Sequence, residues 1–89
     1  MEILLLKSRN LKKNYVVIYP NPATNQIEIT GLTFNNYLYV LNMIGCVVLK
    51  ARVTDKNIQL DVSKLNSGFY YIKTDNGDLT KFIKLETPN

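Results

Sequence analysis

Short runs of strand-forming residues recur along the chain at intervals of roughly ten residues, and each run ends at Gly, Asn, Asp or Pro. Helical periodicity is nearly absent. Several runs alternate apolar and polar residues, which places the two kinds of side chain on opposite faces of a strand. The spacing predicts an all-β fold, an immunoglobulin-like antiparallel β-sandwich of about seven strands between residues 16 and 85.

The first half of the chain contains three of these runs. Residues 15–19 form the first, which ends at Pro20-Asn21-Pro22, where two prolines remove two backbone donors. Residues 26–30 alternate strictly, so one face of this strand is expected to be wet. Residues 37–41 are apolar on both faces. We expect the second sheet to cover one face of this strand and aromatic neighbours to cover the other.

A hairpin loop is predicted at Asn42-Met43-Ile44-Gly45, because Asn favours tight turns and Gly supplies positive φ. Cys46 borders this turn, and we expect a small buried side chain there rather than a reactive thiol. The strand that follows has an apolar face made of Val47, Leu49, Ala51 and Val53. Its opposite face carries Val48, Lys50 and Arg52.

The remaining strands follow in the second half. Residues 58–62 alternate, and the loss of alternation over residues 61–65 predicts a bend capped by side-chain oxygens. Residues 68–74 are rich in aromatic and β-branched types. We expect Asn76-Gly77 to occupy the two central positions of a type I′ turn, so that residues 79–85 fold back antiparallel.

The basic charge is concentrated ahead of this predicted sandwich. Four basic residues and one acidic residue within residues 1–18 account for +3 of the formal +4. We therefore divide the chain into a basic leader or linker remnant, residues 1–14, and a sandwich domain, residues 15–89. Residues 3–7 fit either an extra edge strand or a linker. Their apolar run is too short for a signal peptide or a membrane span, so the chain as given is expected to carry neither.

Catalytic and metal-binding chemistry is not expected. The chain has no His and a single Cys, which leaves no usual general base, no intrachain disulfide and no metal-ligand spacing. Asp75 and Asp78 could approach each other across a hairpin, but two carboxylates fall short of the oxygen count of a calcium site. We therefore predict neither an enzyme nor a cofactor. Nucleic-acid stacking through Tyr70, Tyr71 and Lys73 is less favoured than use of the aromatic rings in the core.

Four motifs occur in a particular order. Tyr-Pro-Asn-Pro-Ala at residues 19–23 precedes a middle strand that ends at a turn containing Gly45. Asp-Val-Ser-Lys-Leu-Asn-Ser-Gly-Phe-Tyr follows at residues 61–70, and Lys-Phe-Ile-Lys at residues 81–84. In this order the motifs resemble the type IX secretion C-terminal sorting domains of Bacteroidetes, type A of the Por secretion family. The resemblance covers residues 16–85.

The resemblance implies a monomeric handle for export, secreted or placed on the cell surface by way of the periplasm as part of a larger protein. Its partners would be the type IX outer-membrane translocon and a sortase-like peptidase, which cuts near Lys12-Lys13-Asn14. The cargo would then be released or attached to lipopolysaccharide. The motif positions carried over are Pro20, Asn21, Pro22, Gly45, Asp61, Leu65, Gly68, Tyr70, Lys81 and Lys84.

Physical roles are expected at several of these positions. Gly68 is expected to supply a backbone shape closed to other residues, and Tyr70 to pack between the sheets with its hydroxyl on a loop carbonyl. Lys81 and Lys84 are expected to be exposed beside unpaired backbone groups of an edge strand, which a receptor could read by strand addition. The alternative function is an immunoglobulin-like adhesion or carbohydrate-binding module, suggested by the tyrosine content.

Overall fold

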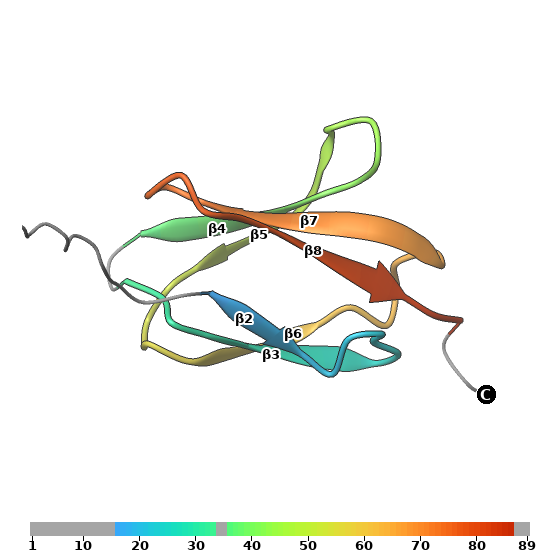
Figure 1. Ribbon diagram of the computed structural model, residues 1–89, viewed down its shortest axis with the longest axis horizontal. Helices are drawn as coiled ribbons and strands as arrows, with labels where there is room; N and C mark the ends of the chain where they lie inside the picture. The colour runs from blue at the N-terminus through green and yellow to red at the C-terminus, as the bar shows by residue number, and fades with distance from the viewer. Residues whose placement is uncertain (1–15, 34–35, 87–89) are drawn as a thin grey trace, which may run out of the picture.

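The computed structural model describes residues 16–33 and 36–86, which fold into two facing layers of strands (Figure 1). The described strands are β2 (Val17–Tyr19), β3 (Gln26–Thr30), β4 (Tyr37–Leu41), β5 (Val47–Arg52), β6 (Ile58–Asp61), β7 (Gly68–Thr74) and β8 (Leu79–Lys84). They form two antiparallel sheets with the orders β2-β3-β6 and β5-β4-β7-β8. The predicted all-β sandwich is confirmed.

The predictions for the N-terminal part concern residues that the structure does not describe. The leader at residues 1–14, the edge strand at residues 3–7 and the cleavage region at residues 12–14 all lie there. In the described part, the fourth strand in chain order, β5, pairs with β4. The four-stranded sheet therefore gains the strand that in constant-type immunoglobulin domains belongs to the opposite sheet.

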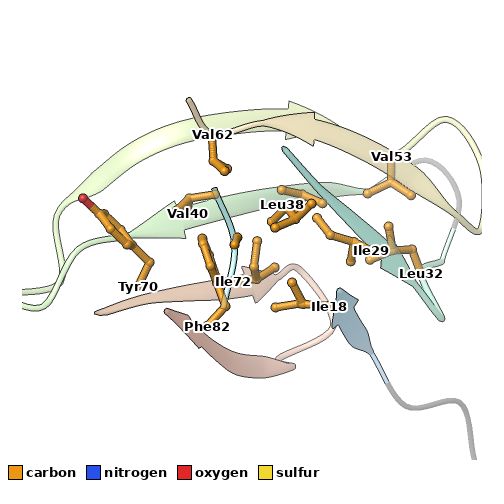
Figure 2. Close-up of a cluster of buried hydrophobic side chains, with 12 residues drawn as sticks. Ile18, Ile29, Leu32, Leu38, Val40, Val53, Val62, Tyr70, Ile72 and Phe82 are labelled. Carbon is orange, nitrogen blue, oxygen red and sulfur yellow. The ribbon is translucent and has the colours of Figure 1, made fainter. Parts of the chain in front are cut away.

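The core lies between the sheets and is built from every second residue of the strands (Figure 2). Ile27 and Ile29 of β3 are fully buried, as are Leu38 and Val40 of β4. Burial of each such side chain contributes roughly 1.5–3 kcal/mol. Tyr70 and Phe82 stack at one end of the cluster with ring centroids 5.7 Å apart. The buried face that alternation predicts for β3 is thus confirmed.

The β4–β5 hairpin closes as a tight turn with a glycine bulge. Gly45 N donates to Asn42 O at 3.0 Å, and Asn42 N donates to Cys46 O at 2.9 Å. Gly45 has φ 88°, a conformation that side chains with a Cβ rarely adopt. The Asn42 carboxamide oxygen also accepts from the amides of Ile44 and Cys46. The roles predicted for Asn42 and Gly45 are confirmed.

The β7–β8 hairpin repeats this construction one residue earlier than predicted. Gly77 N donates to Thr74 O at 3.0 Å, and Thr74 N donates to Asp78 O at 3.0 Å. The central pair of the turn is therefore Asp75 and Asn76, while Gly77, with φ 93°, forms the bulge. The hairpin is confirmed and the type I′ assignment is wrong. At the first central position, the Asp75 carboxylate also accepts a hydrogen bond from Tyr37 N of β4.

The start of β5 corrects two further predictions. The register between β4 and β5 shifts after Val40, so that Val47 opposes Leu41 and the inward–outward alternation is interrupted. Val47 is 56% exposed instead of buried with Leu49. Cys46 is also exposed, because the hairpin rises away from the sandwich and no second layer reaches it (Figure 1).

Candidate recognition site at the closure of the sandwich

The opening motif runs along the outer edge of the last strand. Asn21 lies where a further strand would pair with β8, and its carboxamide acts like a peptide group. The Asn21 oxygen accepts from Ile83 N at 2.9 Å, and its nitrogen donates to Lys81 O at 3.4 Å. This side chain joins two motifs that are about sixty residues apart along the chain.

The backbone of Ala23 continues this pairing. Ala23 N donates to Ile83 O at 2.7 Å, and Leu85 N donates to Ala23 O at 2.7 Å. The two bonds form a short parallel bridge between Ala23 and Lys84. The expectation of unpaired backbone groups beside Lys81 and Lys84 is therefore wrong for the half of β8 from Lys81 onward, because Asn21 and Ala23 already occupy its edge.

The two lysines of the closing motif lie on opposite faces of β8. Positions 81 and 84 are an odd number of residues apart, and alternation in a strand separates them. Lys81 is exposed, with its ammonium 5.0 Å from the ring centroid of Phe69. Lys84 is 1% exposed and donates to Leu85 O at 2.6 Å. The prediction that both are exposed is wrong for Lys84, whose apolar stem joins the interior.

The loop between β6 and β7 ends in a tyrosine corner. Tyr70 is 7% exposed, and its hydroxyl donates to Asn66 O at 2.7 Å, four residues upstream. A tyrosine near the start of this strand, bonded back to the preceding corner, is a hallmark of Greek-key sandwiches. Both roles expected of Tyr70, packing between the sheets and bonding a loop carbonyl, are confirmed.

Gly68 begins β7 with φ 152°, outside the range open to residues with a Cβ. A Cβ built on Gly68 would meet no heavy atom within 4 Å. The requirement for glycine therefore comes from the backbone conformation and not from crowding. The shape predicted for this position is confirmed.

Asp61 caps the start of the same loop. Its Oδ1 accepts from Ser63 N at 2.9 Å, as predicted for this bend. Hydrogen bonds from the Ser63 hydroxyl and amide, helped by nearby Lys64, lower the pKa of Asp61 below its usual value of 3.8. Further along, Leu65 is partly buried and packs on the core. The motif of residues 61–70 is thus a loop held at both of its ends.

The lowered pKa of Asp61 predicts a pH-dependent contribution to stability. Its folded pKa lies below the unfolded one, so the stabilisation is present above the unfolded pKa and is lost as the pH falls through the folded one. We expect wild type to be more stable than Asp61→Asn at pH 7, and the difference in urea midpoint to shrink between about pH 5 and pH 2. A difference that stays constant over this range would contradict the prediction.

A second prediction concerns Asn21. Asn21→Leu removes both hydrogen bonds to β8 and is expected to lower the free energy of unfolding by about 1–3 kcal/mol. Amide hydrogen exchange at Ile83 is expected to accelerate, since its acceptor is lost. Asn25→Leu is the matched control, because this exposed side chain makes no such bridge, and it is expected to change stability by about 0.5 kcal/mol or less. Equal effects of the two substitutions would contradict the prediction.

Three of the four motifs therefore meet at one end of the sandwich. Gly68 opposes Lys84 across β7 and β8, Tyr70 opposes Phe82, and Ala23 bridges to Lys84. Gly45 is not part of this cluster; it lines a groove on the outer face of the four-stranded sheet. Sequence reasoning missed the contact of Asp75 with the start of β4, because the position of Asp75 in a turn gives no signal of a partner on another strand.

The pair considered for calcium has other partners. The Asp75 carboxylate accepts from Tyr37 N at 2.9 Å and from the Tyr39 hydroxyl at 3.2 Å. The Asp78 carboxylate accepts from the Thr74 hydroxyl at 3.2 Å. Both groups tie the β7–β8 turn to neighbouring backbone or side chains. Among residues 16–33 and 36–86, no three His, Cys, Asp or Glu side chains gather as a metal site would require.

Fold and closure together define a small β-sandwich module in which an opening motif, a tyrosine corner and a closing strand are tied together. A family model described as the secretion system C-terminal sorting domain matches residues 17–85, and the chain belongs to this family. Searches of curated proteins and of solved structures found no match to the chain.

Membership places the domain in type IX secretion as a C-terminal sorting signal. It implies a secreted or cell-surface protein that passes the outer membrane and interacts with the secretion machinery. No helix suited to crossing a membrane occurs in the described part of the chain.

Proposed function

We propose that this domain is the handle by which the outer-membrane translocon recognises a larger exported protein, and that it is not itself an enzyme. The observation that supports this most directly is the use of the motif residues. Asn21, Gly68, Tyr70 and Lys84 each specify the closure of the sandwich by backbone shape, burial or hydrogen bonding. Motif residues with structural roles of this kind are expected in a domain whose partner recognises its folded surface.

We further propose that a sortase-like peptidase removes the domain by a cut ahead of β2, in the region of residues 12–14, after which the cargo is released or attached to lipopolysaccharide. Support comes from the position of the opening motif. Because Asn21 and Ala23 hold β8, a cut between these two residues would separate Asn21 from the fragment that contains the last strand. A cut ahead of Val17 leaves these contacts intact.

The test is a fusion of the full chain behind a reporter that reaches the periplasm on its own signal peptide. In a host with the type IX pathway, we expect the reporter on the cell surface or in the medium, separated from the domain. The reporter without the chain, and the fusion in a translocon-deficient host, are the controls and should stay in the periplasm. Periplasmic retention of a folded fusion in the competent host would overturn the proposal.

A further inference from the structure

The outer face of the four-stranded sheet combines cations with aromatic rings. Across the strands, Tyr39 lies between Lys50 and Lys73, and Tyr71 pairs with Lys81. We call this surface the basic aromatic face; it comprises Tyr37, Tyr39, Leu41, Lys50, Arg52, Phe69, Tyr71, Lys73 and Lys81. It points away from the other sheet.

Two cations of this face, Lys50 and Lys81, lie over aromatic rings. The Lys50 ammonium is 4.5 Å from the ring centroid of Tyr37 and 5.9 Å from that of Tyr39. On this face of β4, Leu41 lies opposite Tyr71 of β7, one aromatic neighbour of the kind predicted for this strand. A cation held over a ring is ordered before a partner arrives, so less side-chain entropy is lost on binding.

The β4–β5 hairpin overhangs this face and encloses a groove. It rises on the side opposite β2, β3 and β6 (Figure 1). The groove has a volume of about 490 Å³, within the range of about 300–1,000 Å³ typical of binding pockets. Its lining includes Tyr39, Leu41, Val47, Lys73 and Asp75. The groove is therefore apolar in part and is lined by one cation, Lys73, and one carboxylate, Asp75, which accepts hydrogen bonds from Tyr37 N and the Tyr39 hydroxyl.

Aliphatic side chains at the hairpin tip extend the apolar surface. Met43 is 67% exposed and Ile44 is 83% exposed. Both line a second depression of about 220 Å³, together with Phe69. Exposed aliphatic clusters next to aromatic and basic residues have the composition of a protein–protein interface. Such aliphatic side chains gain little from a sugar, so a protein partner is favoured over a glycan.

The opposite face of the sandwich has the reverse charge. Strands β2, β3 and β6 contain no Lys or Arg, and their outward residues include Glu28 and Asp61. Strands β4, β5, β7 and β8 contain no Asp or Glu; the nearest carboxylates, Asp75 and Asp78, belong to the β7–β8 turn. An acidic partner would therefore be attracted to the face of the four-stranded sheet and repelled by the face of the three-stranded sheet.

We propose that the basic aromatic face, with the tip of the β4–β5 hairpin, docks onto an acidic protein surface with an apolar centre that belongs to the secretion machinery. This inference rests on the proposed function and adds which surface is read. Since Asn21 and Ala23 occupy the edge of β8 from Lys81 onward, strand addition along that half of β8 is closed.

The test compares two charge reversals that change the net charge of the reporter fusion equally. Lys50→Glu alters the basic aromatic face, and Lys56→Glu alters an exposed lysine of the loop between β5 and β6. We expect surface display to fall about tenfold or more for the first variant, because like charges would meet in the complex, and to be retained for the second. Circular dichroism melting of each purified chain verifies folding.

A conservative variant completes the design. Lys50→Arg keeps the charge and is expected to retain display even if Lys50→Glu is less stable. Equal display by wild type and both reversed variants would overturn the docking face while leaving the sorting function intact, whereas failure of wild type itself would overturn the sorting function. A face variant whose only defect is weaker retention on an anionic polysaccharide column would also overturn it, since that result assigns the face to glycans.

Discussion

Tyr70→Ala is expected to lower the free energy of unfolding by about 3–5 kcal/mol, the range seen when a large buried ring is removed from a core. Tyr70 stacks on Phe82 and closes the β6–β7 loop through Asn66 O. A domain of this size has a total stability of about 5–10 kcal/mol, so this variant is expected to lose between about a third and all of it. The measurement is urea denaturation followed by far-ultraviolet circular dichroism.

A second substitution separates the ring from the hydroxyl. Tyr70→Phe keeps the stacking on Phe82 and leaves the Asn66 carbonyl without this donor, so the expected loss is about 1–2 kcal/mol. Tyr71→Phe is the matched control, because Tyr71 lies on the opposite face of β7, and its expected change is about 0.5 kcal/mol or less. Equal losses for the two Phe variants would show that the bond to Asn66 does not stabilise the corner.

Local patterns predicted the elements well, because turns and alternation depend on neighbouring residues. Gly45 and Gly77 mark hairpins at positions where positive φ is required, and the strict alternation of residues 26–30 places Ile27 and Ile29 in the core. Tyr70 was predicted correctly for a related reason: its hydroxyl reaches only four residues back along the chain.

Features that depend on contacts between distant residues could not be predicted from local sequence patterns. Asn21 pairs with β8 about sixty residues away, and the local sequence of neither segment predicts that the two lie side by side. The exposure of Cys46 follows from a hairpin that leaves the sandwich plane, which a local pattern does not encode. The register shift after Val40 likewise depends on which residues of β4 and β5 pair.

The contacts that close the sandwich and the basic aromatic face involve different residues. Asn21, Ala23, Tyr70 and Lys84 hold together the ends of the sandwich, and their side chains or backbone groups are already engaged. The groove beside Lys73 and the tip of the β4–β5 hairpin remain open on the far side of the four-stranded sheet. If the face docks as proposed, motif residues act on export through folding, and residues of the face act on it through contact.

The two lysines of the closing motif provide the sharpest separation of these roles. Lys84→Glu is expected to lower the free energy of unfolding by about 3–5 kcal/mol, since it places a carboxylate at a buried site next to the Leu85 carbonyl. Lys81→Glu is expected to cost about 1 kcal/mol or less, because only an exposed contact with the Phe69 ring is lost. Urea denaturation at pH 7 measures both.

Lys84→Met distinguishes the charge from the stem. It keeps an apolar chain of similar length and removes the ammonium, so the expected loss of about 1–2 kcal/mol reflects the polar contacts of the ammonium, including the hydrogen bond to Leu85 O. In the export assay, Lys84→Glu should then be displayed less than Lys84→Met, because it is the less stable of the two. Equal stability losses from Lys81→Glu and Lys84→Glu would contradict the placement of the two side chains on opposite faces of β8, and with it the assignment of Lys84 to the closure.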